Sequence, residues 1–150
     1  MFESGKRNEY SNDRASGEYA LSLIRRLARR ESTEELLYDY LKVISDDSVT
    51  KRILHSVLMD ERAQFRMLKE LYKHLTGAPL EVQAPNFIRP ESLKDGLSGI
   101  MMRKAKKIKL YTQLINNLPA NYSPFLFSFI NDEHMHMNLI NFLLIRSSGE

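Results

Sequence analysis

The segment DERAQ at residues 60–64 returns as DEHMH at residues 132–136, 72 residues later (132 minus 60). A second match has nearly the same offset. Glu31 and Lys104 lie 73 residues apart (104 minus 31), and each is followed seven residues later by a tyrosine. Self-similarity at a fixed offset marks a repeated structural unit. The chain therefore contains two copies of one unit.

Each copy consists of two amphipathic segments. Apolar residues recur every three or four positions, which places them on one face of an α-helix. Turn and capping residues separate the segments: residues 46–48 supply a turn and a helix cap, Gly77 can end a helix, and Ser123 followed by Pro124 can begin one. We predict four helices, at about residues 18–44, 48–75, 90–117 and 123–145.

The connection between the second and third segments, residues 76–89, determines the topology. Fourteen residues extend to about 46 Å, whereas a helix of 27 residues is about 40 Å long. The connection can therefore run the whole length of a helical bundle, which also explains why so long a loop exists. We predict an all-α fold, a four-helix bundle made of two antiparallel helical hairpins joined by a long crossover.

The chain has 150 residues, of which 43% are hydrophobic and 27% charged, as expected for one globular domain. We predict a polar, flexible segment at residues 1–17, the bundle at residues 18–145 and a frayed tail at residues 146–150. The first residues lack the apolar stretch of a signal peptide, and no apolar run approaches the roughly 18 residues of a membrane span. We therefore expect a cytoplasmic protein that does not contact a membrane.

The composition excludes several chemistries. The chain has no cysteine, which rules out disulfides, iron–sulfur clusters, thiolate metal sites and cysteine nucleophiles. Any metal must be held by nitrogen and oxygen ligands. The net charge is only +3, and no groove-reading, phosphate-loop, dinucleotide or catalytic-triad signature is present, so nucleic acid is not an expected partner.

Four charged residues interrupt the apolar faces in the middle of the predicted helices: Glu31, Glu61, Lys104 and Glu133. The repeat aligns Glu31 with Lys104 and Glu61 with Glu133. An unpaired charge in a protein core costs several kcal/mol. Four charges at matching depth therefore indicate mutual ion pairing or a metal site.

These residues resemble the ferritin-like superfamily, specifically its rubrerythrin-related branch, over nearly all of residues 18–145. In such proteins two helices each supply one glutamate, the other two each supply Glu-x-x-His, and the set binds metal. The resemblance implies that Glu31, Glu61, Glu133 and His136 are metal ligands. It also places Tyr38 where the family has an aromatic residue, and the repeat gives Tyr111 the corresponding place beside the site in the second copy.

Two positions depart from the family pattern. Gln64 replaces a histidine and is a weak metal ligand at best, and Lys104 replaces a glutamate. Three carboxylates and one lysine sum to a charge of −2 when His136 is neutral, which one divalent ion would balance. We interpret Lys104 as a substitute for the charge of a second metal ion, and we predict that it pairs with Glu61 or Glu133.

Two functions are compatible with this pattern. In the first, the protein has a degenerate metal site and is a non-catalytic or single-metal relative that acts as an interaction or assembly module. In the alternative, it is a rubrerythrin-like iron or manganese protein that handles metal or reacts with peroxide or dioxygen. The expected cofactor is one Fe or Mn ion per chain, or none, and the expected partner is a second copy of the chain in a homo-oligomer.

Two basic blocks, residues 25–30 and 103–109, complete the pattern. We interpret both as solvated helix faces, with a phosphate-bearing or acidic partner as the alternative. The remaining histidines, His55, His74 and His134, are expected on the surface.

Overall fold

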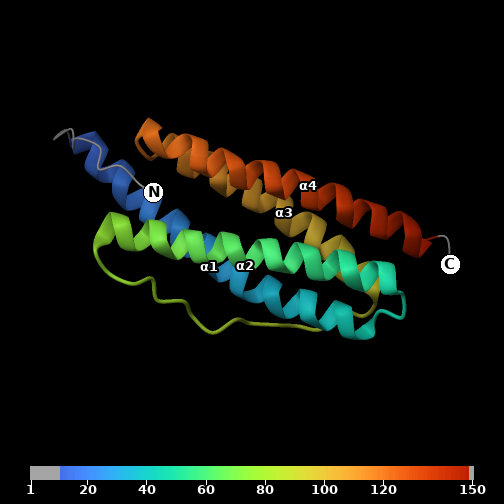
Figure 1. Ribbon diagram of the computed structural model, residues 1–150. Helices are drawn as coiled ribbons and strands as arrows, with labels where there is room; N and C mark the ends of the chain where they lie inside the picture. The colour runs from blue at the N-terminus through green and yellow to red at the C-terminus, as the bar shows by residue number, and fades with distance from the viewer. Residues whose placement is uncertain (1–10, 149–150) are drawn as a thin grey trace.

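The computed structural model describes residues 11–148 (Figure 1). They form four long helices, α1 (Ser11–Ile44), α2 (Ser48–Thr76), α3 (Leu93–Asn116) and α4 (Ser123–Ser148), and one short 3₁₀ helix, η1 (Ala120–Tyr122). This part of the chain contains no strand, and none of its helices is long and apolar enough to cross a membrane. The predicted all-α fold is confirmed.

The helices form two hairpins. α1 packs antiparallel to α2, and α3 packs antiparallel to α4 (Figure 1). Residues 77–92 form the crossover, which returns along the bundle so that α2 and α3 run in the same direction. Leu80 and Val82 of the crossover contact the core near one end of the bundle, and Phe87 contacts the core near the other. The predicted end-to-end crossover is confirmed.

Local capping explains where the helices begin and end. Asp47 caps α2 by accepting hydrogen bonds from the N–H groups of Val49 and Thr50. Gly77 ends α2 in the left-handed conformation at φ 74°, which glycine adopts without steric cost. Ser92 caps α3 by accepting from Asp95 N–H, so that helix begins at Leu93 and not near residue 90.

Both terminal helices are longer than predicted. α1 begins at Ser11, ahead of the apolar face that starts after Glu18, because extending an existing helix costs little. α4 continues to Ser148, and Arg146 forms an ion pair with Asp47 at 2.6 Å, which ties the end of α4 to the start of α2. Residues 1–10 of the predicted flexible segment and residues 149–150 of the predicted tail lie outside the described residues.

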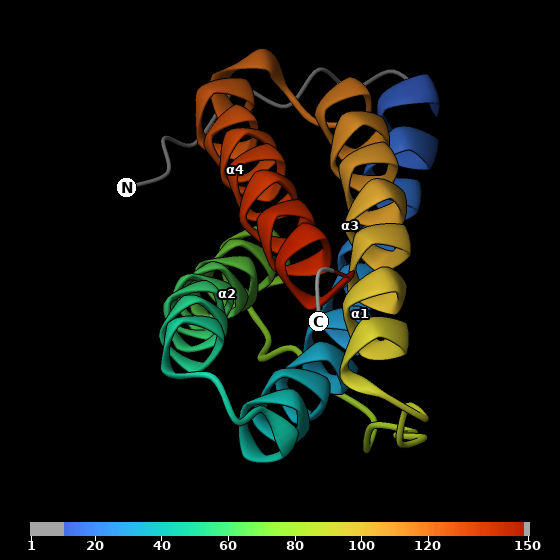
Figure 2. The same cartoon turned by 90° about the vertical axis from the view of Figure 1, so that its right-hand side faces the viewer.

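The interior of the bundle contains two apolar cores. The Tyr111 core includes Leu27 and Leu68 together with Tyr111 and Phe129, and the Tyr38 core includes Tyr38, Leu58, Ile100 and Ile140. Each core draws on all four helices, which surround a common interior (Figure 2). A layer of buried polar side chains lies between the two cores.

Candidate functional site

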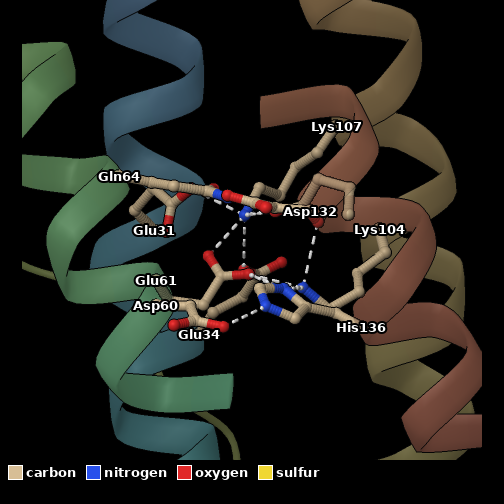
Figure 3. Close-up of polar contacts among 10 residues, drawn as sticks. Glu31, Glu34, Asp60, Glu61, Gln64, Lys104, Lys107, Asp132 and His136 are labelled. Carbon is tan, nitrogen blue, oxygen red and sulfur yellow. Dashed lines mark hydrogen bonds and ion pairs between the residues drawn. The ribbon is translucent and has the colours of Figure 1, made fainter. Parts of the chain in front are cut away.

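The polar layer consists of side chains from all four helices that converge on the bundle axis (Figure 3). α1 supplies Glu31 and Glu34, α2 supplies Glu61 and Gln64, α3 supplies Lys104 and Lys107, and α4 supplies Glu133 and His136. All eight residues are buried. Helical geometry accounts for this convergence, because residues three apart lie on the same face of a helix.

Lys104 is the first of two buried cations. Its Nζ lies 2.5 Å from Glu61 Oε1, 2.9 Å from Glu133 Oε2 and 3.4 Å from His136 Nδ1. The predicted ion pair with Glu61 or Glu133 is confirmed, and Lys104 pairs with both. The Lys104 side chain is fully buried. Water therefore cannot take the place of these contacts around its ammonium group.

Lys107 is the second buried cation. Its Nζ lies 2.6 Å from Glu31 Oε1, 3.2 Å from Glu34 Oε2, 2.6 Å from Glu61 Oε2 and 3.1 Å from Glu133 Oε1. Glu61 and Glu133 therefore each use one oxygen for Lys104 and the other for Lys107. Two bridging carboxylates join the two ammonium groups into one network.

Two further contacts close the network at its edges. His136 Nε2 lies 2.9 Å from Asp60 Oδ2, and Gln64 Nε2 donates to Asp132 Oδ2 at 3.3 Å. The internal repeat relates these contacts, because Asp60 corresponds to Asp132 and Gln64 to His136. His136 Nδ1 also lies 3.4 Å from Glu61 Oε1. The two hairpins thus contribute equivalent cross-links between α2 and α4.

Tyr38 and Tyr111 lie on opposite sides of the polar layer. Each is fully buried in the apolar core that bears its name, and neither hydroxyl has a hydrogen-bond partner among the described residues. The Lys104 ammonium lies 5.9 Å from the centre of the Tyr38 ring. Their predicted role beside a metal site stays a prediction.

The environment separates the carboxylates by protonation state. Burial raises the pKa of Glu31 well above its ordinary value, helped by the negative charge of Glu61, and burial likewise raises the pKa of Glu34. Burial acts in the same direction on Glu61, but Lys107 and Lys104 outweigh it and hold the pKa of Glu61 well below its ordinary value. The network therefore favours the ionised form of Glu61 and the protonated form of Glu31.

The cations remain charged. Burial alone would lower the pKa of both lysines, but the acidic groups around each ammonium outweigh it and raise both pKa values well above the ordinary one. The pKa of His136 is also raised, because its contacts with Glu61 and Asp60 outweigh its burial and the charge of Lys104. Four ionised glutamates and two ammonium groups sum to −2, and the raised pKa values of Glu31, Glu34 and His136 favour proton uptake that reduces this negative charge.

Two residues of this site, Glu34 and Lys107, are not among those expected from the sequence. The prediction that residues 103–109 form a solvated face is wrong at Lys107, which is buried, whereas Lys106 and Lys109 are exposed. The repeat carries the signal that could have found the pair. The offset that aligns Glu31 with Lys104 also aligns Glu34 with Lys107. The expected count of three carboxylates and one lysine becomes four carboxylates and two lysines.

The structure places the other predicted residues in or beside the same polar layer. Glu31, Glu61, Glu133 and His136 lie within the network, and Gln64 lies at its edge, where its amide faces Asp132. Their role as metal ligands stays a prediction. His55, His74 and His134 are exposed, as expected.

The donor set can be compared with that of a pair of metal ions. Two groups of potential ligand atoms lie within 4.8 Å of one another, one from Glu61, Glu133 and His136 and the other from Glu31, Glu34 and Glu61. The first group surrounds the Lys104 ammonium and the second surrounds that of Lys107. The carboxylates that would bind two divalent cations already bind two ammonium groups, so the residues present do not fit a two-metal centre.

The fold is therefore a helical bundle of two antiparallel hairpins with a buried lysine–glutamate centre. No protein-family model and no curated protein matches the sequence. Among solved structures, the chain is similar to one described as "ferritin like, diiron-carboxylate proteins" from Bacillus anthracis str. Ames, with a TM-score of 0.75 and 20% identity. The match covers 86% of this chain and 97% of the other, and it shows that the chain has the ferritin-like fold.

We predict that Lys107→Met lowers the free energy of unfolding by about 3–5 kcal/mol, because it leaves several buried carboxylates without their shared cation. Urea denaturation followed by circular dichroism measures this change. Lys106→Met is the matched control, because Lys106 is exposed on the same helix, and it should change stability by less than about 0.5 kcal/mol. Equal effects of the two substitutions would contradict the network.

We also predict that the protein loses stability as the pH rises from about 5 to 8. Folding raises the pKa values of Glu31, Glu34 and His136. The ordinary pKa values are about 4.3 for glutamate and 6.5 for histidine. The contribution of each group to stability is complete below its ordinary pKa and is lost as the pH rises through its pKa in the folded protein. Glu61 has a lowered pKa, so its contribution is lost only at more acidic pH.

Thermal melts across this pH range measure the effect, which amounts to about 1.4 kcal/mol per pH unit for each proton released. Glu31→Gln should reduce the slope, because glutamine resembles the protonated acid. Glu70→Gln, an exposed change on α2, should leave it unaltered. If stability instead increased with pH in this range, the buried Glu31 and Glu34 would be ionised without a cost in folding free energy, and the prediction would be wrong.

Proposed function

We propose that this protein is a ferritin-like bundle in which two lysines take the place of metal ions, and that it acts as a non-catalytic interaction or assembly module. The observation that carries the proposal is the pair of buried ammonium groups, each in contact with at least two of the carboxylates expected to bind metal. In this proposal the protein has the ferritin-like helical bundle, but ion pairs with lysine occupy the interior position where metal ions were expected.

The energetics of the site favour lysine over metal. A divalent cation could bind these carboxylates only after Lys104 or Lys107 lost its proton or moved away. The raised pKa values oppose loss of the proton, and complete burial opposes movement. Gln64 further weakens the site, because an amide oxygen is a poorer ligand than imidazole for iron or manganese.

The shape of the site also argues against catalysis. The space beside Glu31 and Glu61 has a volume of about 10 Å³, which is room for about one water molecule. A substrate would need a larger opening or a change in the packing of the surrounding side chains. A structural role requires neither.

The alternative is a rubrerythrin-like iron or manganese protein that handles metal or reacts with peroxide or dioxygen. The observation that favours it is the group formed by Glu61, Glu133 and His136, two carboxylates and one imidazole with ligand atoms within 4.8 Å of one another. This reading requires Lys104 to give up its contacts with all three residues. It implies one ion per chain.

Metal binding by two chains tests the proposal. Wild-type protein from iron- or manganese-supplemented medium should contain far less than one ion per chain, and added Mn(II) should leave its melting temperature unchanged. The triple variant Gln64→His, Lys104→Glu, Lys107→Met should gain a melting temperature that rises with Mn(II), because a ligand that binds only the folded state stabilises it by mass action.

A matched control combines Gln64→His with Lys106→Glu and Lys109→Met, which makes the same chemical changes at exposed lysines. This control should not respond to Mn(II). A wild-type chain that carries one ion and melts higher with metal would establish the alternative. A triple variant without a metal response would show that the lysines do not occupy the place of ions.

A further inference from the structure

The outward face of α4 differs from the rest of the protein surface. α4 runs along one edge of the bundle, with its inner side packed mainly on α3 (Figure 1). Ten of its residues between positions 124 and 145 are exposed, and none of them is charged: Pro124, Phe127, Ser128, Asn131, His134, Met135, Asn138, Asn141, Phe142 and Ile145. We call these ten residues the α4 face.

The absence of charge from this face is unusual in a chain with 27% charged residues. The exposed side of α2, for comparison, carries Lys51, Arg62, Arg66 and Lys69. The α4 face also exposes large apolar side chains, since Phe127 is 52% exposed, Met135 51%, Phe142 47% and Ile145 67%. Depletion of charge together with exposed aromatic and methionine side chains is the composition of a protein–protein interface.

The order of residues along the α4 face indicates what covers it. Positions equally distant from the midpoint between His134 and Met135 carry similar side chains. The pairs are Phe127 with Phe142, Asn131 with Asn138, Ser128 with Asn141, Pro124 with Ile145, and His134 with Met135. Apolar positions therefore correspond to apolar ones and uncharged polar positions to uncharged polar ones, apart from the unlike central pair.

Such a palindrome is compatible with a twofold interface between two copies of one helix, because like side chains then meet across the axis. In a twofold dimer the same surface meets itself, so residue i contacts residue j and residue j contacts residue i. Two antiparallel α4 helices centred on this midpoint bring Phe127 against Phe142 of the partner subunit at both ends. Asparagine both donates and accepts hydrogen bonds, so Asn131 can pair with Asn138 of the partner subunit.

We infer that the α4 face is the interface of a homodimer, formed by antiparallel packing of α4 on α4 of a second copy. This inference deepens the proposed function, because it assigns the assembly role to one surface and one partner. A second copy fits better than an unrelated protein, because antiparallel pairing of two copies matches apolar with apolar and uncharged polar with uncharged polar side chains along the α4 face. The lack of charge also suits such an interface, since a charge on the α4 face would be buried against an uncharged residue of the partner subunit.

Sedimentation of the full chain tests the dimer. The molar mass measured for the wild-type protein should be twice the 17.5 kDa of one chain. Phe127→Asp should raise the dimer dissociation constant at least about 100-fold, because it places a charge in the apolar part of the interface. Met102→Asp is the matched control, since Met102 is 66% exposed on α3, and it should leave the dimer intact. A monomeric wild-type chain, or equal effects of the two variants, would overturn the inference.

Disulfide formation tests the antiparallel arrangement, and the chain has no native cysteine to interfere. An oxidised mixture of Asn131→Cys and Asn138→Cys chains should form a mixed disulfide-linked dimer faster than either variant forms one with itself. In the inferred arrangement the two Asn131 positions are about 10 Å apart along the axis, since seven residues span that rise. Faster linkage of either variant to itself, or no linkage, would contradict the arrangement.

These results remain separate from the test of the lysine–glutamate centre. A metal-free monomer would overturn the α4 interface and leave the proposed centre standing. A dimer that carries one ion per chain would support the α4 interface and overturn the proposed lysine–glutamate centre.

Discussion

Charge neutralisation at the centre of the bundle is the constraint on which this structure depends. Glu31, Glu34, Glu61 and Glu133 lie in a layer with almost no access to water, where an uncompensated charge costs several kcal/mol. Lys104 and Lys107 meet that requirement by contacting carboxylates from the three other helices. The spacing of all four helices at mid-height is therefore set by the length of an ion pair.

The same constraint fixes the register of the helices. An apolar core tolerates a small sliding of one helix past another, because dispersion contacts are not directional. Hydrogen-bonded ion pairs are directional, and here each bridging carboxylate contacts both lysines through different oxygens. The ion-pair layer therefore sets the register of the four helices, and the Tyr38 and Tyr111 cores pack on either side of it.

Much of this arrangement could be predicted from the sequence. The helical periodicity and the length of residues 76–89 predict the bundle and its crossover, and the polar interruptions predict that Glu31, Glu61, Lys104 and Glu133 meet. Glu34 and Lys107 were not predicted as site residues. Each belongs to a charged stretch, in which only helical phase distinguishes an inward residue from an outward one. The spacing of three residues from Glu31 and Lys104, together with the repeat that aligns Glu34 with Lys107, carries that phase. The outer ends of α1 and α4 depend on helix extension and on the Arg146 ion pair, which local periodicity does not report.

The distribution of charge between the two repeats has a consequence for how such a core can arise. Metal ions can be shared by two identical halves, because each half then supplies the same carboxylates. Lysines cannot serve two identical halves in this way, since the glutamates of α1 need lysines at the matching positions of α3. Two copies of one ancestral hairpin could have enclosed ions as equal partners, but the present core required the copies to diverge into an acidic and a basic member. Their covalent linkage in one chain keeps the two members in equal number.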